Sequence, residues 1–245
     1  RRDLSQRVVA AKSEQGIERA RKTSIGDLDV DHLRKHVAVR REPLAQHSEA
    51  HVERGEYAEF HANYHPYFRN FLEKFGYYDI FLVEPENGRV VYSVFKELDY
   101  ATSLVDGPYS QSNFAAAFRA VQGSRNPDLV KMVDFDEYYP SYQSAASFLS
   151  VPIIDGDEPV GVLVFQIPID QINTTMTNSG SWSSVGLGRS GETYMVSNDY
   201  SMRNDSRLLI EDPDSFFGNL QKQNIPSEKI TRIRSLQSSI LIQNA

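Results

Sequence analysis

Residues 134–142, Asp-Phe-Asp-Glu-Tyr-Tyr-Pro-Ser-Tyr, hold the densest group of side chains that could bind a ligand. The segment contains three carboxylates and three tyrosines. Carboxylates can receive a ligand's ammonium group, and tyrosines can provide an apolar wall with a polar tip. The segment lies between two predicted strands, where a loop can cover one face of an antiparallel sheet. A polar surface loop whose tyrosines half-cover the sheet is the alternative interpretation, and both stay open.

A second group of candidate side chains comes from an earlier predicted strand and its exit. If residues alternate between the faces of that strand, Tyr92, Lys96 and Tyr100 would face the same cavity as the acidic segment. We therefore predict a ligand site between the sheet and a lid. Its predicted contacts are Tyr92, Lys96, Tyr100, Asp134, Asp136, Tyr138, Tyr142 and Ser147.

All six histidines occur within the first 65 residues, as pairs with i, i+4 spacing. On a helix this spacing places two imidazoles on one face, which makes a metal site conceivable. No pair has a third ligand nearby in an obvious register, so we predict no bound metal. The pairs are His32 and His36, His47 and His51, and His61 and His65.

The run Gly186-Leu-Gly-Arg-Ser-Gly191 matches the G-x-G-x-x-G pattern of dinucleotide-binding loops. Such a loop must follow a strand and open a helix, whereas this run follows a linker and enters a predicted strand. No Walker loop, G-x-S-x-G elbow, H-E-x-x-H helix or kinase signature occurs. A serine hydrolase would need a histidine near a sheet-borne serine, and every histidine precedes the predicted sheet. We therefore predict neither enzymatic activity nor a cofactor.

The composition argues against further classes of site. A net charge of -7 at pH 7 is spread over mixed signs, which disfavours a nucleic-acid partner because counterion release needs clustered Lys and Arg. The absence of cysteine excludes disulfides, thiol catalysis and Cys-based metal sites, and it suits an exported bacterial domain. No apolar run approaches the ~18 residues needed to cross a bilayer.

Five strand-like runs must position the candidate residues. Asn87-Gly88 fits the positive φ angles of a hairpin turn between the first two runs, and Asp155-Gly156-Asp157 closes the last two. Hairpin-connected strands with one helical crossover predict an α+β fold, with an antiparallel sheet and helices on one face. The predicted strands are residues 78–83, 89–95, 129–135, 147–154 and 160–167.

Helical patterns precede and interrupt the predicted sheet. Residues 1–75 read as a predominantly helical lead, which includes an aromatic-rich helix over 57–75. A lead of this length cannot bury itself and must pack on the later sheets or on a second copy of the protein. The crossover helix is predicted at 113–122, with Ser112 or Asn113 as its N-cap and Gly123 at its end.

The C-terminal part of the chain repeats the layout of the first hairpin. Strand, turn and strand are predicted over 191–204, which suggests two tandem modules of one type, the second incomplete. The predicted domains are a helical lead at 1–75, a first module at 76–178 and a partial second module at 182–245. The predicted elements of this part are a helix at 169–177, strands at 191–197 and 200–204, helices at 215–223 and 227–237, and a strand start at 239–243.

Several runs carry a resemblance to a known family. They are residues 75–83, FGYYDIFLV; 91–97, VYSVFKE; 159–166, PVGVLVFQ; 186–194, GLGRSGETY; and 202–207, MRNDSR. Together they resemble the double Cache extracytoplasmic sensor domains of bacterial chemoreceptors, sensor histidine kinases and cyclic-nucleotide signalling enzymes. The resemblance covers about residues 64–241, and the GLGRSGETY run matches best. The chain departs from the family's amino-acid-binding branch, because the arginine-tryptophan-tyrosine ligand motif is missing and the single tryptophan, Trp182, lies in the predicted linker.

The resemblance implies a long N-terminal helix, a membrane-distal PAS-like module that usually holds the ligand, a membrane-proximal PAS-like module and flanking transmembrane helices outside this chain. It implies the periplasmic small-molecule sensing region of a bacterial inner-membrane receptor of the chemoreceptor, histidine kinase or cyclase type, with a homodimer through the N-terminal helix. We expect the native domain to continue past Ala245. The alternative function is a periplasmic module that binds a partner protein instead of a metabolite.

Overall fold

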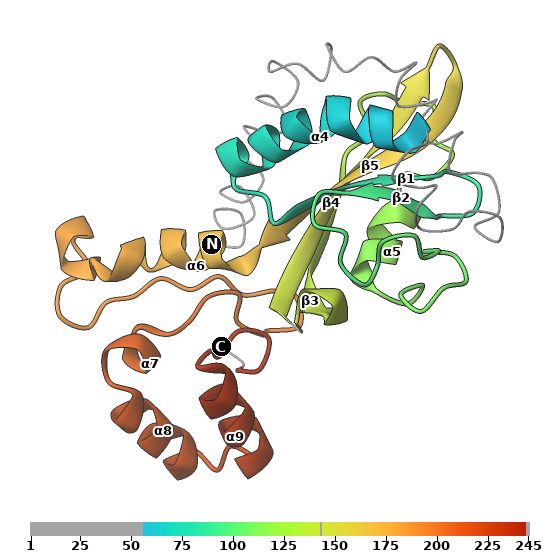
Figure 1. Ribbon diagram of the computed structural model, residues 1–245. Coiled ribbons are helices and arrows are strands. Elements are labelled where there is room, and N and C mark those ends of the chain that lie inside the picture. The colour runs from blue at the N-terminus through green and yellow to red at the C-terminus, as the bar shows by residue number, and fades with distance from the viewer. Residues whose placement is uncertain (1–55, 143, 244–245) are drawn as a thin grey trace. The chain divides into compact units, whose positions relative to one another are not determined.

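The computed structural model describes residues 56–142 and 144–243 of the chain (Figure 1). The chain divides into two compact units. The sheet unit comprises the described residues up to Val133 together with Ser147–Ile167, and the helical unit comprises Asp134–Ala146 and the residues from Pro168 onward. This division begins the second unit at Pro168 and adds the acidic segment to it, whereas the sequence predicted modules at 76–178 and 182–245. The predicted helical lead before residue 56, with two of its histidine pairs, lies outside the described residues.

The sheet unit is built on one five-stranded antiparallel sheet with the strand order β2-β1-β5-β4-β3. All five predicted strands are confirmed, and so is the α+β class. Every residue of β1 is buried, so this central strand is covered on both faces. The strands are β1 Asp79–Val83, β2 Val90–Ser93, β3 Lys131–Tyr138, β4 Ser144–Asp155 and β5 Glu158–Pro168.

Helix α4, Glu56–Phe75, covers one face of the sheet (Figure 1). Its apolar residues Phe68 and Leu72 are buried in one cluster with alternate residues of β1, such as Ile80 and Leu82. Each such buried side chain contributes about 1.5–3 kcal/mol. The helix ends at Gly76, whose φ is 71° and whose N–H donates to the Leu72 carbonyl at 2.8 Å, as the sequence predicted.

Helix α5, Asn113–Arg119, lies on the opposite face of the sheet (Figure 1). Ser112 caps it by accepting a hydrogen bond from the Ala115 N–H at 3.2 Å, which confirms the first of the two predicted caps. The Phe114 ring packs against Phe81 of β1 and Phe148 of β4, at centroid distances of 4.5 and 4.9 Å. The prediction of helices on one face only is therefore wrong, because both faces of the central strands are apolar and each needs a cover.

The first hairpin depends on Gly88. Its φ is +63°, and a Cβ there would lie 3.0 Å from a Val105 methyl carbon and 3.1 Å from the Phe118 ring. The turn is closed by a hydrogen bond from the Glu84 N–H to the Arg89 carbonyl at 2.9 Å. The predicted hairpin turn is confirmed with positive φ at Gly88, whereas Asn87 does not have the positive φ that was predicted for the pair.

The helical unit is held by short helices around a small apolar cluster. Phe216 and Phe217 of α8 are buried there with Ile230 and Ile233 of α9. The helices predicted after residue 168 are confirmed to within a few residues, while α7 was not predicted. The elements are α6 Ile169–Met176, α7 Arg207–Glu211, α8 Pro213–Lys222 and α9 Ser227–Leu236, with 3-10 turns at Asn178–Gly180 and Trp182–Val185.

The strands predicted at 191–197, 200–204 and 239–243 are wrong. One isolated bridge joins Val196 and Met202, and Met202 also exchanges backbone hydrogen bonds with Leu241 and Gln243. Two backbone hydrogen bonds flank the bridge, from the Ser197 N–H to the Ser201 carbonyl at 3.1 Å and from the Arg203 N–H to the Met195 carbonyl at 2.8 Å. Beyond the bridge, side chains bond the backbone in place of a longer ladder; Asn204 Oδ1, for example, accepts from the Met195 N–H at 2.6 Å. Within residues 56–142 and 144–243, no helix combines the length and apolar character needed to cross a membrane.

Candidate functional site

The eight predicted ligand contacts fall in both units. Tyr92, Lys96, Tyr100 and Ser147 belong to the sheet unit, and Asp134, Asp136, Tyr138 and Tyr142 belong to the helical unit. That all eight line one cavity stays a prediction. Inside the sheet unit, the structure brings Tyr92 and Lys96 together with two histidines that the sequence considered only as metal ligands.

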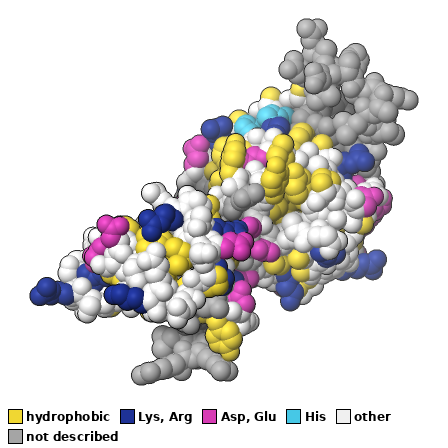
Figure 2. All heavy atoms as spheres, turned by 90° about the horizontal axis from the view of Figure 1, so that it is seen from below, with side chains coloured by type: hydrophobic (Ala, Val, Ile, Leu, Met, Phe, Trp, Pro, Cys, Tyr) yellow, Lys and Arg dark blue, Asp and Glu magenta, His cyan; other side chains and the backbone are white. Residues whose placement is uncertain are grey.

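His61 and His65 of α4 meet Tyr92 of β2 and Lys96 just beyond the end of that strand. The Lys96 Nζ lies 2.7 Å from His61 Nε2, and the Tyr92 hydroxyl lies 3.0 Å from His65 Nδ1. The two imidazole rings are stacked with centroids 4.5 Å apart, which confirms that the i, i+4 spacing puts them on one helix face. We call these four residues the His–Lys cluster. In Figure 2 the histidine side chains of the described chain appear at the surface beside a basic side chain.

Packing of α4 on β2 and the backbone conformation of Lys96 position the residues of the His–Lys cluster. Phe68, one turn after His65, packs on the Tyr92 ring at a centroid distance of 4.8 Å and anchors α4 to β2. Lys96 adopts a left-handed φ of 53°, and its N–H donates to the Ser93 hydroxyl at 2.9 Å. This conformation is uncommon for a side-chain-bearing residue and places the lysine beside the helix.

Electrostatics within the His–Lys cluster favour neutral histidines. The pKa of His61 is lowered to about 4, mainly by partial burial and also by the nearby charges of Lys96 and His65. Burial likewise lowers the pKa of His65, with additional effects from Lys96 and Arg69. A positive charge on either imidazole is therefore unfavourable beside the lysine, and an added negative charge would relieve this repulsion.

The carboxyl group of Asp79 is buried beside Ser93 and Val94, at the end of β2. It accepts hydrogen bonds from the Ser93 hydroxyl at 2.7 Å and from the N–H groups of Ile80 and Val94 at 2.6 and 2.9 Å. Burial nevertheless raises the pKa of Asp79 to about 7, against the effect of these hydrogen bonds, and the charge of Asp99 adds to the increase. Because Ser93 also accepts from the Lys96 N–H, one chain of hydrogen bonds connects Asp79 to the backbone of the His–Lys cluster.

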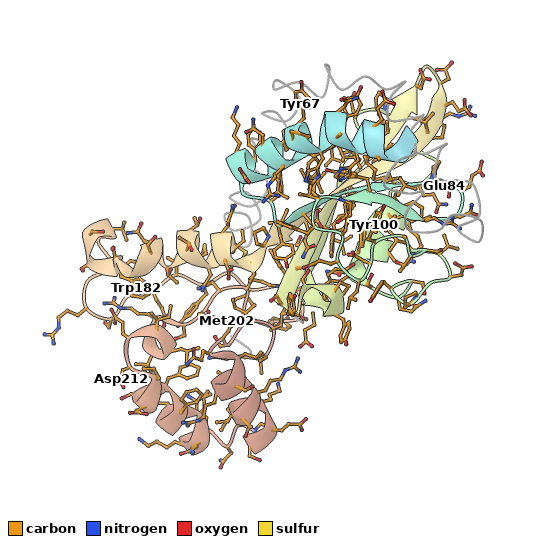
Figure 3. The ribbon with its side chains drawn as sticks, in the orientation of Figure 1. Tyr67, Glu84, Tyr100, Trp182, Met202 and Asp212 are labelled. Atoms are coloured by element: carbon orange, nitrogen blue, oxygen red, sulfur yellow. The ribbon has the colours of Figure 1, made fainter. Side chains whose placement is uncertain are left out.

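Ser147 and Tyr100, two other predicted ligand contacts, form hydrogen bonds within the sheet unit. The Ser147 hydroxyl is buried and donates to the Val133 carbonyl at 2.7 Å, which ties β4 to β3. Tyr100 is half-buried in the loop after β2 (Figure 3), where its N–H donates to the Glu97 carbonyl at 3.0 Å. These bonds give Ser147 a structural role.

The predicted acidic segment has mixed surroundings in the helical unit. Tyr138 is buried, whereas Tyr142 is 88% exposed in a left-handed conformation with φ of 56°. Asp136 is exposed and accepts from the N–H of its neighbour Glu137 at 2.8 Å. Asp134 pairs with a buried cation, Arg203, which the sequence did not identify as its partner.

The Arg203 side chain is buried and binds the Asp134 carboxylate through two nitrogens. Its Nε lies 3.2 Å from Oδ1 and its Nη2 2.9 Å from Oδ2. The Ser197 hydroxyl also donates to the carboxylate. Burial alone would raise the pKa of Asp134, but the hydrogen bonds from Arg203 and Ser197 outweigh that effect and lower it.

Arg207 organises the GLGRSGETY run. One of its terminal nitrogens donates to the carbonyls of Gly188 and Gly191 at 3.1 and 2.9 Å, and its guanidinium lies 4.9 Å from the ring centre of Trp182 (Figure 3). Its own N–H donates to the Glu192 carboxylate at 2.6 Å. The run forms turns and opens no helix, so its glycines serve this internal contact and a dinucleotide fingerprint is not formed.

Sequence reasoning missed the arginines of the helical unit because their partners are remote in sequence. The run MRNDSR was quoted for its resemblance alone, although two arginines beside buried polar residues are a signal of an ion-pair network. Among the described residues, no three His, Asp or Glu side chains gather as a metal site. The described pair His61 and His65 is instead engaged with Lys96 and Tyr92.

Comparison with known proteins gives distant structural neighbours. No protein-family model and no curated protein matches the chain. The chain is similar to the sensor domain of the Vibrio cholerae histidine kinase DctB, with 16% identity and a TM-score of 0.35 over 69% of this chain and 60% of that one. It is also similar to the ligand-binding domain of the Pseudomonas aeruginosa PAO1 amino acid chemoreceptor PctC, in complex with GABA, with 15% identity and a TM-score of 0.38 over 76% of this chain and 65% of that one.

A third neighbour is the ligand-binding domain of the Pseudomonas fluorescens chemoreceptor CtaA in complex with L-serine, with 13% identity and a TM-score of 0.40 over 83% of this chain and 73% of that one. The chain thus spans less than two thirds of the first two neighbours. All three are sensor or ligand-binding domains of signalling receptors. At TM-scores of 0.35 to 0.40, the fold of this chain rests on its own strand order.

Proposed function

We propose that this chain is the extracytoplasmic small-molecule sensing region of a bacterial transmembrane signal-transduction receptor. The runs that resemble double Cache domains indicate the class of protein, and the five-stranded antiparallel sheet with helices on both faces suits it. Fold likeness alone is an analogy and does not assign a ligand. The observation that carries the proposal is the His–Lys cluster, because it groups a lysine, two imidazoles with lowered pKa values and a tyrosine hydroxyl.

The His–Lys cluster suits the anionic group of a small molecule. Lys96 supplies a positive charge with three N–H donors, and the neutral imidazoles of His61 and His65 add adaptable donors beside it. An ammonium group beside imidazole N–H donors is chemically suited to an oxyanion, of which a carboxylate is the commonest in metabolites. The Tyr92 hydroxyl completes a set of polar groups above an apolar base that includes Phe68. The other predicted contacts remain predictions.

The arrangement in the cell follows from the same proposal. The chain would lie in the periplasm, with residues 76–178 as the membrane-distal sensing module and residues 182–245 as part of a membrane-proximal one. Transmembrane helices and an output domain would lie outside this chain, and the N-terminal helical lead would form a homodimer. The sensing region itself would have no enzymatic activity and no cofactor, whatever the output domain does.

A ligand screen with two lysine variants tests the proposal. We expect at least one anionic metabolite to raise the melting temperature, since binding to the native state at a hundredfold excess over Kd adds about 2.7 kcal/mol. Lys96→Met should abolish that shift. Lys74→Met removes an exposed lysine of helix α4 that lies outside the cluster, and it should preserve the shift. If a ligand acts equally on both variants, sensing stands and the site lies elsewhere.

A second candidate function is supported by exposed tyrosines of the helical unit. Tyr142 is 88% exposed, Tyr200 69% and Tyr139 62%, and tyrosine is enriched at protein–protein interfaces. A periplasmic module that binds a partner protein would use such side chains. A broad metabolite screen without any shift, together with capture of a periplasmic protein that is lost on Tyr142→Ser, would favour this function over sensing.

A further inference from the structure

The tip of the β3–β4 hairpin belongs to the helical unit, although both strands begin or end in the sheet unit. Asp134–Ala146 clusters with the residues from Pro168 onward, while β3 starts at Lys131 and β4 runs on to Asp155. The covalent chain therefore passes between the units twice within these two strands. The bonds that hold the tip in the helical unit therefore determine how strongly unfolding or displacement of one unit affects the other.

Two ion pairs within the helical unit hold the hairpin tip. Arg203 binds the Asp134 carboxylate through two nitrogens, and Arg232 of α9 pairs with Glu137. The two pairs are unequal, because the Arg203 side chain is 5% exposed whereas that of Arg232 is 46% exposed. A two-nitrogen arginine–carboxylate pair with a buried guanidinium is directional and strong, while exposed pairs contribute little. Asp134 thus forms the stronger of the two ion pairs at the tip.

The attachment reaches the strand backbone directly. Asp134 Oδ1 accepts from the Phe135 N–H at 2.7 Å, in addition to the Arg203 bond. On the other side, an Arg203 terminal nitrogen donates to the Ser201 hydroxyl, so the guanidinium is fixed by its own segment. A displacement of β3 along its axis must therefore stretch the Arg203 bonds or move the segment that bears them.

We propose that Arg203 is a positioning residue that locks the tip of the β3–β4 hairpin into the helical unit, so that the two units unfold and rearrange as one cooperative system. This coupling requires no ligand. A displacement of the sheet would be transmitted to the helical unit through β3, β4 and the Arg203–Asp134 ion pair. A brace that only stabilises the helical unit is the competing explanation, and it predicts no effect on cooperativity.

The chain offers separate reporters for the two units. Trp182, its single tryptophan, is buried in the helical unit, so its fluorescence follows that unit. Hydrogen exchange of the β1 and β5 amides follows the sheet unit. In urea titrations of the full chain, the two reporters should share one midpoint. Arg203→Met should separate them, with the tryptophan transition at lower urea, and Arg203→Lys should partly restore their coincidence.

Arg207→Met is the matched control. It removes a second buried arginine of the helical unit, whose partners are Glu211, Gly188, Gly191 and the Trp182 ring and not the hairpin tip. It should lower the common midpoint without separating the reporters. Because this variant also changes the surroundings of Trp182, the midpoint of its transition is compared and not the fluorescence intensity. If Arg203→Met does not fold, Asp134→Asn cuts the same bond from its exposed side and should give the same separation. Two transitions in the unaltered protein, or coincident transitions in both Arg203→Met and Asp134→Asn, would overturn the proposal.

Discussion

The pKa values of two ionisable groups in the sheet unit and of two in the helical unit are shifted in opposite senses, toward the neutral form and toward the charged form respectively. In the sheet unit the pKa of His61 is lowered and that of Asp79 is raised, so both are displaced toward their neutral forms. In the helical unit the pKa values of Asp134 and Asp199 are lowered, toward the charged form. The helical unit thus uses charge to hold its structure, whereas the sheet unit holds groups whose charge is unfavourable.

The difference arises from the nearest neighbours of each group. His61 faces Lys96 and His65, whose charges have the same sign as its own protonated form. Asp134 faces Arg203, which has the opposite sign. Shifts caused by desolvation and like charges are typical of binding sites, whereas shifts caused by opposite charges are typical of structural ion pairs. This contrast is the reason for placing the ligand site at the His–Lys cluster and not at the acidic segment.

The largest expected effect comes from cutting the Asp134–Arg203 pair on its exposed side. Asp134→Ala leaves a guanidinium that is 5% exposed without its main partner, and breaking a buried pair costs about 3–5 kcal/mol. We expect about 3 kcal/mol, because Asp199 remains 3.7 Å away. Arg203→Met should cost less, since water can reach the remaining carboxylate, whose side chain is 53% exposed. Urea denaturation measures both, and the reverse order would show that the pair is not asymmetric.

The second prediction concerns Asp79 and the pH dependence of stability. Its pKa is about 7 in the folded state and 3.8 as a free group, so the folded state holds an extra proton between these values. Stability from this group is full below about pH 4 and is lost as pH rises through 7, by at most about 4 kcal/mol. Asp79→Asn keeps the shape and should remove that loss, so the variant should gain stability relative to the unaltered protein between pH 5 and 8.

His61 should act in the opposite direction and more weakly. Its pKa of about 4 lies below the ordinary 6.5, so the unfolded state takes up a proton first and stability is lost as pH falls from 6.5 to 4. Because the side chain is only partly buried, solvent screening reduces the effect to about 1 kcal/mol. His61→Gln should flatten the acid side of the stability profile, as measured by urea unfolding at pH 4.5 and 7. An unchanged acid side would mean that His61 titrates normally.

The sequence predicted the sheet well because strands and turns are encoded locally. The run of aromatic and branched residues at 78–83 and the Asn-Gly pair both act within a few residues. The pairing of the described histidines on one helix face was equally local. The misplaced strands at 191–204 failed because side chains of Asn204 and Arg207 take the hydrogen bonds that a ladder would use, and that competition has no periodic pattern.

The site was harder to predict because its contacts are long-range. Lys96 and His61 are 35 residues apart, and Arg203 and Asp134 are 69 apart. Tyr92 and Lys96 were named as ligand contacts from strand alternation, but their neighbours on α4 could not be paired with them from spacing. The sequence predicted a ligand site at the acidic segment because Arg203, the cation that pairs with Asp134, is remote in the sequence.

The smallest effect is expected from Asp136, two positions after Asp134 on the same strand. Asp136→Asn should change the free energy of unfolding by less than about 0.5 kcal/mol, because the side chain is exposed and its hydrogen bond is to the neighbouring N–H. It should also leave the affinity for an anionic ligand unchanged when measured by calorimetry, whereas Lys96→Met should abolish binding. If Asp136→Asn weakens a ligand tenfold or more while Lys96→Met does not, the acidic segment binds the ligand and the ligand is a cation. That result would reverse the contrast between the two units, because the exposed carboxylate of the helical unit would then be the one reserved for function.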